Sequence, residues 1–176
     1  MPRFYKIFTI FLLFVFFNNQ AYTEDLKISY VDIDKIIKES NVGKQIDKKI
    51  SSLIKKKNKE FEKIEKELKD KDAELVKQKN ILSKDELNKK IKNLEKEIKD
   101  YRNNKNTFNK DISQKKLKAT GEMVVYLNRI LGKYAADNSI GLIIQKKNIV
   151  IGKSELDITK PILEIFNKEV KKVKLN

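Results

Sequence analysis

The sequence predicts an α+β protein in which a long antiparallel helical hairpin projects from a small body of strands and helices. Two observations carry this prediction. No glycine or proline occurs between Gly43 and Gly121, and apolar residues recur there every three or four positions on a lysine-rich background, which is the pattern of amphipathic helices. Near both ends of the chain, short apolar runs bounded by polar residues have the pattern of strands.

The N-terminus has the pattern of a Sec signal peptide. Arg3 and Lys6 precede an apolar run of eleven residues, and cleavage is plausible after Ala21 or Thr23. The run is shorter than the roughly 20 residues that a spanning helix needs, and an uncleaved anchor is the alternative. We therefore expect residues 1–23 to be removed when the protein is exported.

The next segment is expected to form a strand and a short helix. Leu26, Ile28 and Tyr30 alternate with Lys27, Ser29 and Val31, which predicts a short strand with one buried face. Asp32 or Asp34 can cap the helix that follows. Ser40, Asn41 and Gly43 are expected to interrupt this helix, and a bend is expected near residues 41–43.

The middle of the chain is expected to form the hairpin. The outgoing helix is predicted from about Lys44 to Lys79, and the return helix begins at about Lys84, because Ser83 and Glu86 have the spacing of a capping box. The return helix continues to about residue 138, so its last turns must pack on the body.

The apolar seam of this hairpin is interrupted. Lys57 and Lys71 occupy seam positions of the outgoing helix, and we expect the arm to bend rather than to be a rigid rod. The seam residues of the two helices are Ile46, Ile50, Leu53, Phe61, Ile64, Leu68 and Leu75, and Leu87, Ile91, Leu94, Ile98, Tyr101, Phe108 and Ile112.

The last segment completes the body. Two apolar runs separated by a polar turn predict a β-hairpin, and Asp157 and Thr159 can cap a final helix. Three strands in so small a body leave edges uncovered, so we expect the chain to self-associate. The residues expected in the body of this oligomer are Ile28, Tyr30, Ile140, Leu142, Ile144, Ile149 and Ile151. The domains expected are the signal peptide at 1–23, the body at 24–43 and 119–176, and the helical hairpin at 44–118.

Composition limits the chemistry that this chain can perform. Cysteine and histidine are absent, which removes thiol nucleophiles, disulfides, imidazole bases and nearly every zinc site. Carboxylates such as Glu62 and Glu65 lie on a helix face that is expected to be exposed, and no glycine loop for phosphate binding is present. We expect no enzymatic activity, no metal and no cofactor.

The positive charge of the chain limits the kinds of partner that we expect it to bind. The net charge is +15, and it falls to +13 when Arg3 and Lys6 leave with the signal peptide. For an exported protein the nearest anions are lipid headgroups, lipopolysaccharide and acidic protein chains. Codon bias would also explain so much lysine, which leaves a merely solvated surface as the alternative. Nucleic-acid binding is not expected, because arginine is scarce and because an exported protein leaves the compartment that contains nucleic acid.

The order of these elements resembles the Skp or OmpH-like periplasmic chaperones of Gram-negative bacteria. The segment from Lys27 to Asp32 resembles the opening strand of that family, and the charged hairpin resembles its coiled-coil tentacle. Asp157, Ile158 and Thr159 stand where the family carries Asp-Ile-Thr before its last helix.

This resemblance implies a jellyfish-shaped homotrimer, in which strands of three subunits form a central β-barrel and three tentacles enclose a cavity. The implied function is an ATP-independent holdase chaperone of the periplasm, which holds unfolded outer-membrane proteins before their insertion. For a contact with lipopolysaccharide or another anionic lipid, the resemblance points to Lys89, Lys90 and Lys92. A structural coiled-coil spacer or adaptor of the cell envelope is the alternative, and the strands near both ends favour the chaperone.

Overall fold

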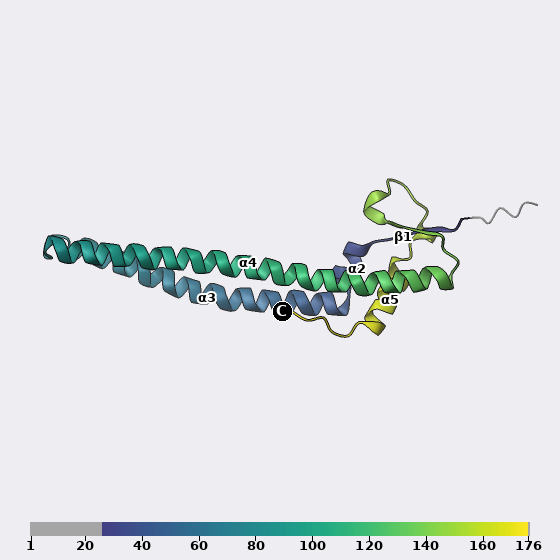
Figure 1. Ribbon diagram of the computed structural model, residues 1–176, viewed down its shortest axis with the longest axis horizontal. Helices are drawn as coiled ribbons and strands as arrows, with labels where there is room; N and C mark the ends of the chain where they lie inside the picture. The colour runs from purple at the N-terminus through teal and green to yellow at the C-terminus, as the bar shows by residue number, and fades with distance from the viewer. Residues whose placement is uncertain (1–25, 176) are drawn as a thin grey trace, which may run out of the picture.

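The computed structural model describes residues 26–175, so the predicted signal peptide lies outside the described residues. Two long helices form an arm, and the shorter elements gather at one end of it (Figure 1). The predicted helical hairpin on a small mixed body is confirmed. In chain order the elements are β1 (Ile28–Val31), α2 (Ile33–Glu39), α3 (Asn41–Gln78), α4 (Lys84–Asp137), β2 (Leu142–Gln145), two 3₁₀ turns (Lys146–Asn148 and Ser154–Leu156) and α5 (Thr159–Glu169).

A tight corner joins the body to the arm. Asp32 caps α2 by accepting a hydrogen bond from the Lys35 amide at 2.9 Å. The helix ends at Glu39, and the Ser40 hydroxyl caps α3 by accepting from the Gly43 amide at 3.1 Å. The predicted interruption is therefore confirmed at Ser40, whereas Asn41 and Gly43 belong to the first turn of α3.

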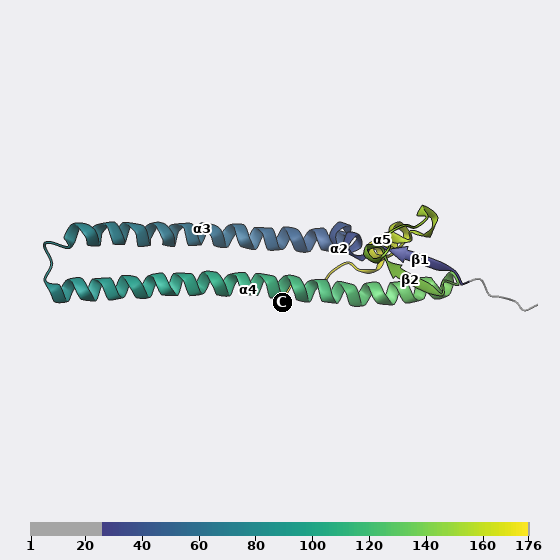
Figure 2. The ribbon, with the colours of Figure 1, turned by 90° about the horizontal axis from the view of Figure 1, so that it is seen from above.

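The arm consists of α3, with 38 residues, and α4, with 54 residues, which are about 57 Å and 81 Å long at 1.5 Å per residue. They run side by side and are joined by a short turn at the tip (Figure 2). The predicted capping box starts α4, since Ser83 and Glu86 exchange both hydrogen bonds. α4 continues without interruption from the arm into the body.

The sheet differs from the prediction. β1 and β2 pair in parallel, with Ile28 opposite Leu142 and Val31 opposite Gln145, and the whole arm lies between them in the sequence. The predicted β-hairpin is wrong, because the second run, 149–151, forms no strand.

The second run has no strand beside it. The free edge of β1 is bridged by Asp157, and the Ile149 amide bonds back to the carbonyl of Lys146 at 3.0 Å. Val150 and Ile151 are therefore fully or almost fully exposed in the single chain. A short apolar run alone does not distinguish a strand from a loop.

The predicted one-sided burial of β1 is also wrong. Ser29, Tyr30 and Val31 are all buried, whereas Ile28 is 39% exposed. Val31 belongs to the core, and on the other side of the strand Tyr30 lies close to Gly152 of the loop that follows β2. Both faces of β1 are thus covered at its C-terminal end, which removes the alternation.

The core lies in the body and reaches into the base of the arm, where Ile46 and Ile50 of α3 belong to it. Its fully buried members include Ile36 of α2, Met123 and Leu127 of α4, and Phe166 of α5. The segment after α5 also belongs to it, since Val170 and Val173 are 4% and 6% exposed. This tail runs back from α5 toward the arm (Figures 1 and 2).

The tail supplies a test of this core. Val173→Ala is expected to lower the free energy of unfolding by about 1–2 kcal/mol, because it removes buried apolar surface. Urea unfolding followed by circular dichroism, at one fixed protein concentration, measures the change. Lys172→Ala, at the exposed neighbour, should change the value by less than about 0.5 kcal/mol. Equal values for the two variants would show that the tail is not anchored.

Candidate functional site

The arm is the largest surface that the chain offers. Only a narrow seam of it is buried, formed by Phe61, Leu68 and Leu94 beyond the body. Leu53 and Ile64, which were predicted in the seam, are 43% and 38% exposed. The tip-proximal Val76 and Ile81 are exposed at 67% and 82%. The arm thus presents scattered apolar side chains among many lysines.

An aromatic cluster joins the two helices at the middle of the arm. The Phe61 ring makes edge contacts with Tyr101 and Phe108, with centroids 5.8 Å and 5.9 Å away. The ammonium of Lys57 lies 5.3 Å from the centre of the Phe61 ring and pairs with Glu60 at 2.7 Å. The lysine that interrupts the seam is therefore accommodated by an aromatic face.

Closer to the tip, polar contacts accompany the apolar ones. Lys71 pairs with Glu97 across the hairpin at 2.6 Å. Beside this pair, α3 and α4 leave two open gaps of about 210 and 230 Å³, each lined in part by Lys71 and Glu97. An exposed ion pair contributes at most about 1 kcal/mol, so this part of the arm is held together weakly.

The three lysines considered for anionic lipid do not form one cluster. Lys89, Lys90 and Lys92 are all exposed on α4, but Lys90 donates a hydrogen bond to Gln78 of α3 at 2.6 Å. At 100° per residue the other two stand on the same side of the helix, and Lys90 faces the partner helix.

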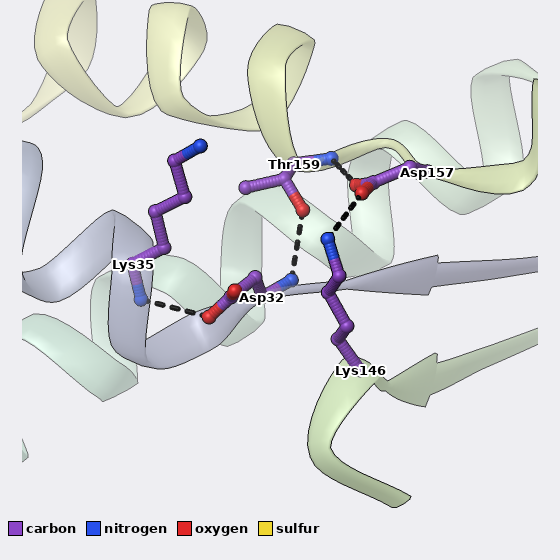
Figure 3. Close-up of polar contacts among 5 residues, drawn as sticks. All are labelled: Asp32, Lys35, Lys146, Asp157 and Thr159. Carbon is purple, nitrogen blue, oxygen red and sulfur yellow. Dashed lines mark hydrogen bonds and ion pairs between the residues drawn. The ribbon is translucent and has the colours of Figure 1, made fainter. Parts of the chain in front are cut away.

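In the body, a polar latch ties the end of β1 to the start of α5 (Figure 3). The Asp32 amide donates to the Thr159 hydroxyl at 2.8 Å. Asp157 accepts from the Thr159 amide at 2.9 Å and from Lys146 at 3.0 Å. The Asp-Ile-Thr segment noted in the sequence is therefore a connector between elements more than 120 residues apart in the chain.

The latch perturbs the titration of Asp157. Partial burial raises the pKa of this carboxyl, but the hydrogen bonds from Thr159 and the ammonium of Lys146 outweigh burial and hold the pKa below its usual value. Asp157 in turn raises the pKa of Lys146.

This pKa shift predicts a pH-dependent contribution to stability. Because the pKa of Asp157 is lower in the folded state, its ionised carboxyl contributes stability at every pH above the unfolded-state pKa. This contribution is lost as the pH falls through the folded-state pKa. Asp157→Asn is expected to lower the free energy of unfolding by about 1 kcal/mol at neutral pH. At a pH below the folded-state pKa of Asp157, the substitution is expected to have no effect. Urea titrations at the two pH values measure this, with the exposed Asp111→Asn as control. A difference that persisted in acid would contradict the latch.

The residues predicted for the oligomer body fall into two groups. Tyr30 and Ile140 are already buried in the single chain, at 8% and 9% exposure, and Ile144 lies opposite Tyr30 in the sheet. The exposed or half-exposed members gather around the sheet and the loop that follows it. They are Ile28, Leu142, Ile149 and Ile151.

Sequence reasoning missed the contacts that cross the chain. The link between Asp32 and Thr159 joins residues 127 apart, and that from Tyr101 to Glu65 joins residues 36 apart. Neither has a local sequence signal. Among residues 26–175, no helix combines the length and apolar character needed to cross a membrane, and no group of three carboxylates is placed to hold a metal ion.

The protein thus belongs to the class of proteins in which a long antiparallel helical hairpin projects from a small α+β body. Residues 27–166 match the family model for outer membrane protein (OmpH-like). The chain therefore belongs to the OmpH-like family, as its resemblance led us to expect.

The fold is similar to a crystal structure of a candidate outer membrane chaperone (OmpH-like) from Caulobacter crescentus CB15. The TM-score is 0.77 at 15% sequence identity, and the similarity covers 86% of this chain and 89% of that chain. At this identity the similarity is one of fold. A search among curated proteins finds no significant match.

Proposed function

We propose that this protein is an ATP-independent holdase chaperone of the periplasm, which binds unfolded outer-membrane proteins and prevents their aggregation before insertion. The observation that carries the proposal is the arm, whose longer helix α4 is about 81 Å long including its part in the body and whose distal part contributes nothing to the core. Membership of the OmpH-like family supports it, as does the fold shared with the candidate chaperone from Caulobacter crescentus CB15.

The surface of the arm supplies a physical mechanism. Its lysines attract acidic client chains over long range, while exposed side chains such as Ile64, Val76 and Ile81 offer weak apolar contacts. Many weak contacts on a flexible arm accommodate clients of different size. Release follows when folding into the membrane competes with these contacts. The protein needs no catalytic residue, cofactor or nucleic acid in this role.

Self-association completes the proposal. The sheet has only two strands, and Ile28, Leu142, Val150 and Ile151 around it are exposed. A homotrimer with the strands in a central barrel would cover these residues and set three arms around one cavity. Export by a cleaved signal peptide brings the chain to its clients. Lys89 and Lys92 remain free to meet anionic lipid or lipopolysaccharide at the membrane surface.

The test is an aggregation assay. A urea-unfolded outer-membrane barrel protein is diluted into buffer with the purified protein and without ATP, and turbidity is followed. We expect suppression at about one oligomer per client, and no effect of an equal mass of a lysine-rich folded protein. Turbidity that rises as it does without the protein would favour an envelope spacer instead.

A further inference from the structure

The part of α4 that belongs to the body has an outward face without charge. Its residues recur every three or four positions, which places them within one sector of the helix. All are exposed, and Leu117 and Val125 are 74% and 69% exposed. We call this surface the α4 outer strip; it consists of Gln114, Leu117, Gly121, Val125, Asn128 and Gly132.

The opposite side of the same helix segment packs into the core through Ala119, Met123 and Leu127. The outward side thus presents two apolar side chains and no charge, although Lys118 and Arg129 border it. An outward face without charge is unusual for a solvated helix, whose outer face normally carries charged residues. In the arm, the same sector of α4 instead carries lysines, among them Lys89, Lys92, Lys96 and Lys99.

The two glycines of the strip support the same conclusion. A Cβ added at Gly121 or Gly132 would have no atom within 4 Å, so nothing within the chain requires glycine there. Glycine in a helix interior is less favourable than alanine. Close approach of another backbone to the strip would offset this cost.

We propose that the α4 outer strip is a contact surface between copies of this chain, an inference that rests on the proposed self-association. The charge of the chain selects this occupant. Two chains that each carry +13 once Arg3 and Lys6 are removed repel one another wherever their lysines face, and the uncharged strip is a place where they approach without that cost. An acidic client is instead drawn to the lysine-rich surfaces.

Gly121→Arg tests the proposal without threatening the fold, since the side chain enters open space and arginine is the better helix former. In the protein purified as cells process it, we expect the dissociation constant of the oligomer to rise at least about tenfold, measured by analytical ultracentrifugation. Asn106→Arg adds the same charge at an exposed position of α4 in the arm and should leave the constant unchanged. Helicity by circular dichroism should stay equal in all three proteins.

The proposal is overturned if the Gly121→Arg protein has the same oligomer mass and dissociation constant as the parent. It is also overturned if the substitution weakens client binding while the oligomer mass and dissociation constant stay the same. It is likewise overturned if the parent is a monomer. The same samples separate this inference from the chaperone function. Continued suppression of aggregation by an unaltered oligomer rejects the strip alone, whereas a parent oligomer that dissociates as expected but never suppresses aggregation rejects the function alone.

Discussion

Gly43→Ala is expected to disrupt the corner between α2 and α3 and to lower the free energy of unfolding by about 3 kcal/mol. A Cβ at this position would lie inside contact distance of the Ile37 carbonyl oxygen and 3.1 Å from the Ser40 hydroxyl. The Ile37 carbonyl is a backbone group, and it cannot move away by a rotamer change as a side chain can. Overpacking of this kind costs roughly 1–3 kcal/mol or more.

The change also acts on the direction of the arm, since Ser40 both ends α2 and caps α3. Thermal unfolding measures the loss of stability, and small-angle scattering measures the change in shape. Lys44→Ala, at the next and exposed position, is the control and should leave both unchanged. A Gly43→Ala protein as stable as the parent would mean that the corner is looser than described.

Removing the arm is expected to abolish chaperone activity and to leave the body folded. Residues 55–111 are replaced by a four-residue turn that joins Ile54 to Ile112, since the two helices lie side by side there. Every buried residue of the core lies outside the deletion, so the body keeps its apolar contacts. Suppression of client aggregation should be lost, because no surface remains that reaches around a client.

A shorter deletion provides the matched control. Replacing residues 69–96 by the same turn removes the weakly held distal part and retains the cluster of Phe61, Tyr101 and Phe108. We expect this variant to protect small clients and to fail with large ones. Full protection by the variant that lacks residues 55–111 would place client binding on the body and contradict the proposed role of the arm.

The sequence predicted the local features of this fold well. The capping box at Ser83 and Glu86 and the cap at Asp32 depend on residues within one turn, and the structure contains them. The long helices followed from an unbroken apolar period. The predicted start of α3 at Lys44 lies three residues after its actual start at Asn41, because Gly43 belongs to the first turn of the helix and does not interrupt it.

The features that failed depend on distant partners. Whether Ile149 and Ile151 form a strand is decided by what lies beside them, and Asp157 already occupies the free edge of β1. Lys71 was recognised as an interruption of the seam, but its pairing with Glu97 depends on the register of the two helices. The latch between Asp32 and Thr159 likewise joins opposite ends of the chain.

The central claim is that the protein holds a client unfolded and releases it to a membrane. The chain contains no tryptophan, so tryptophan fluorescence reports on the client alone. We expect a diluted barrel protein to remain soluble with the protein, to show the emission of exposed tryptophan, and to shift to that of the folded barrel when lipid vesicles are added. A client that precipitates, or that elutes apart from the protein in gel filtration, would contradict the claim.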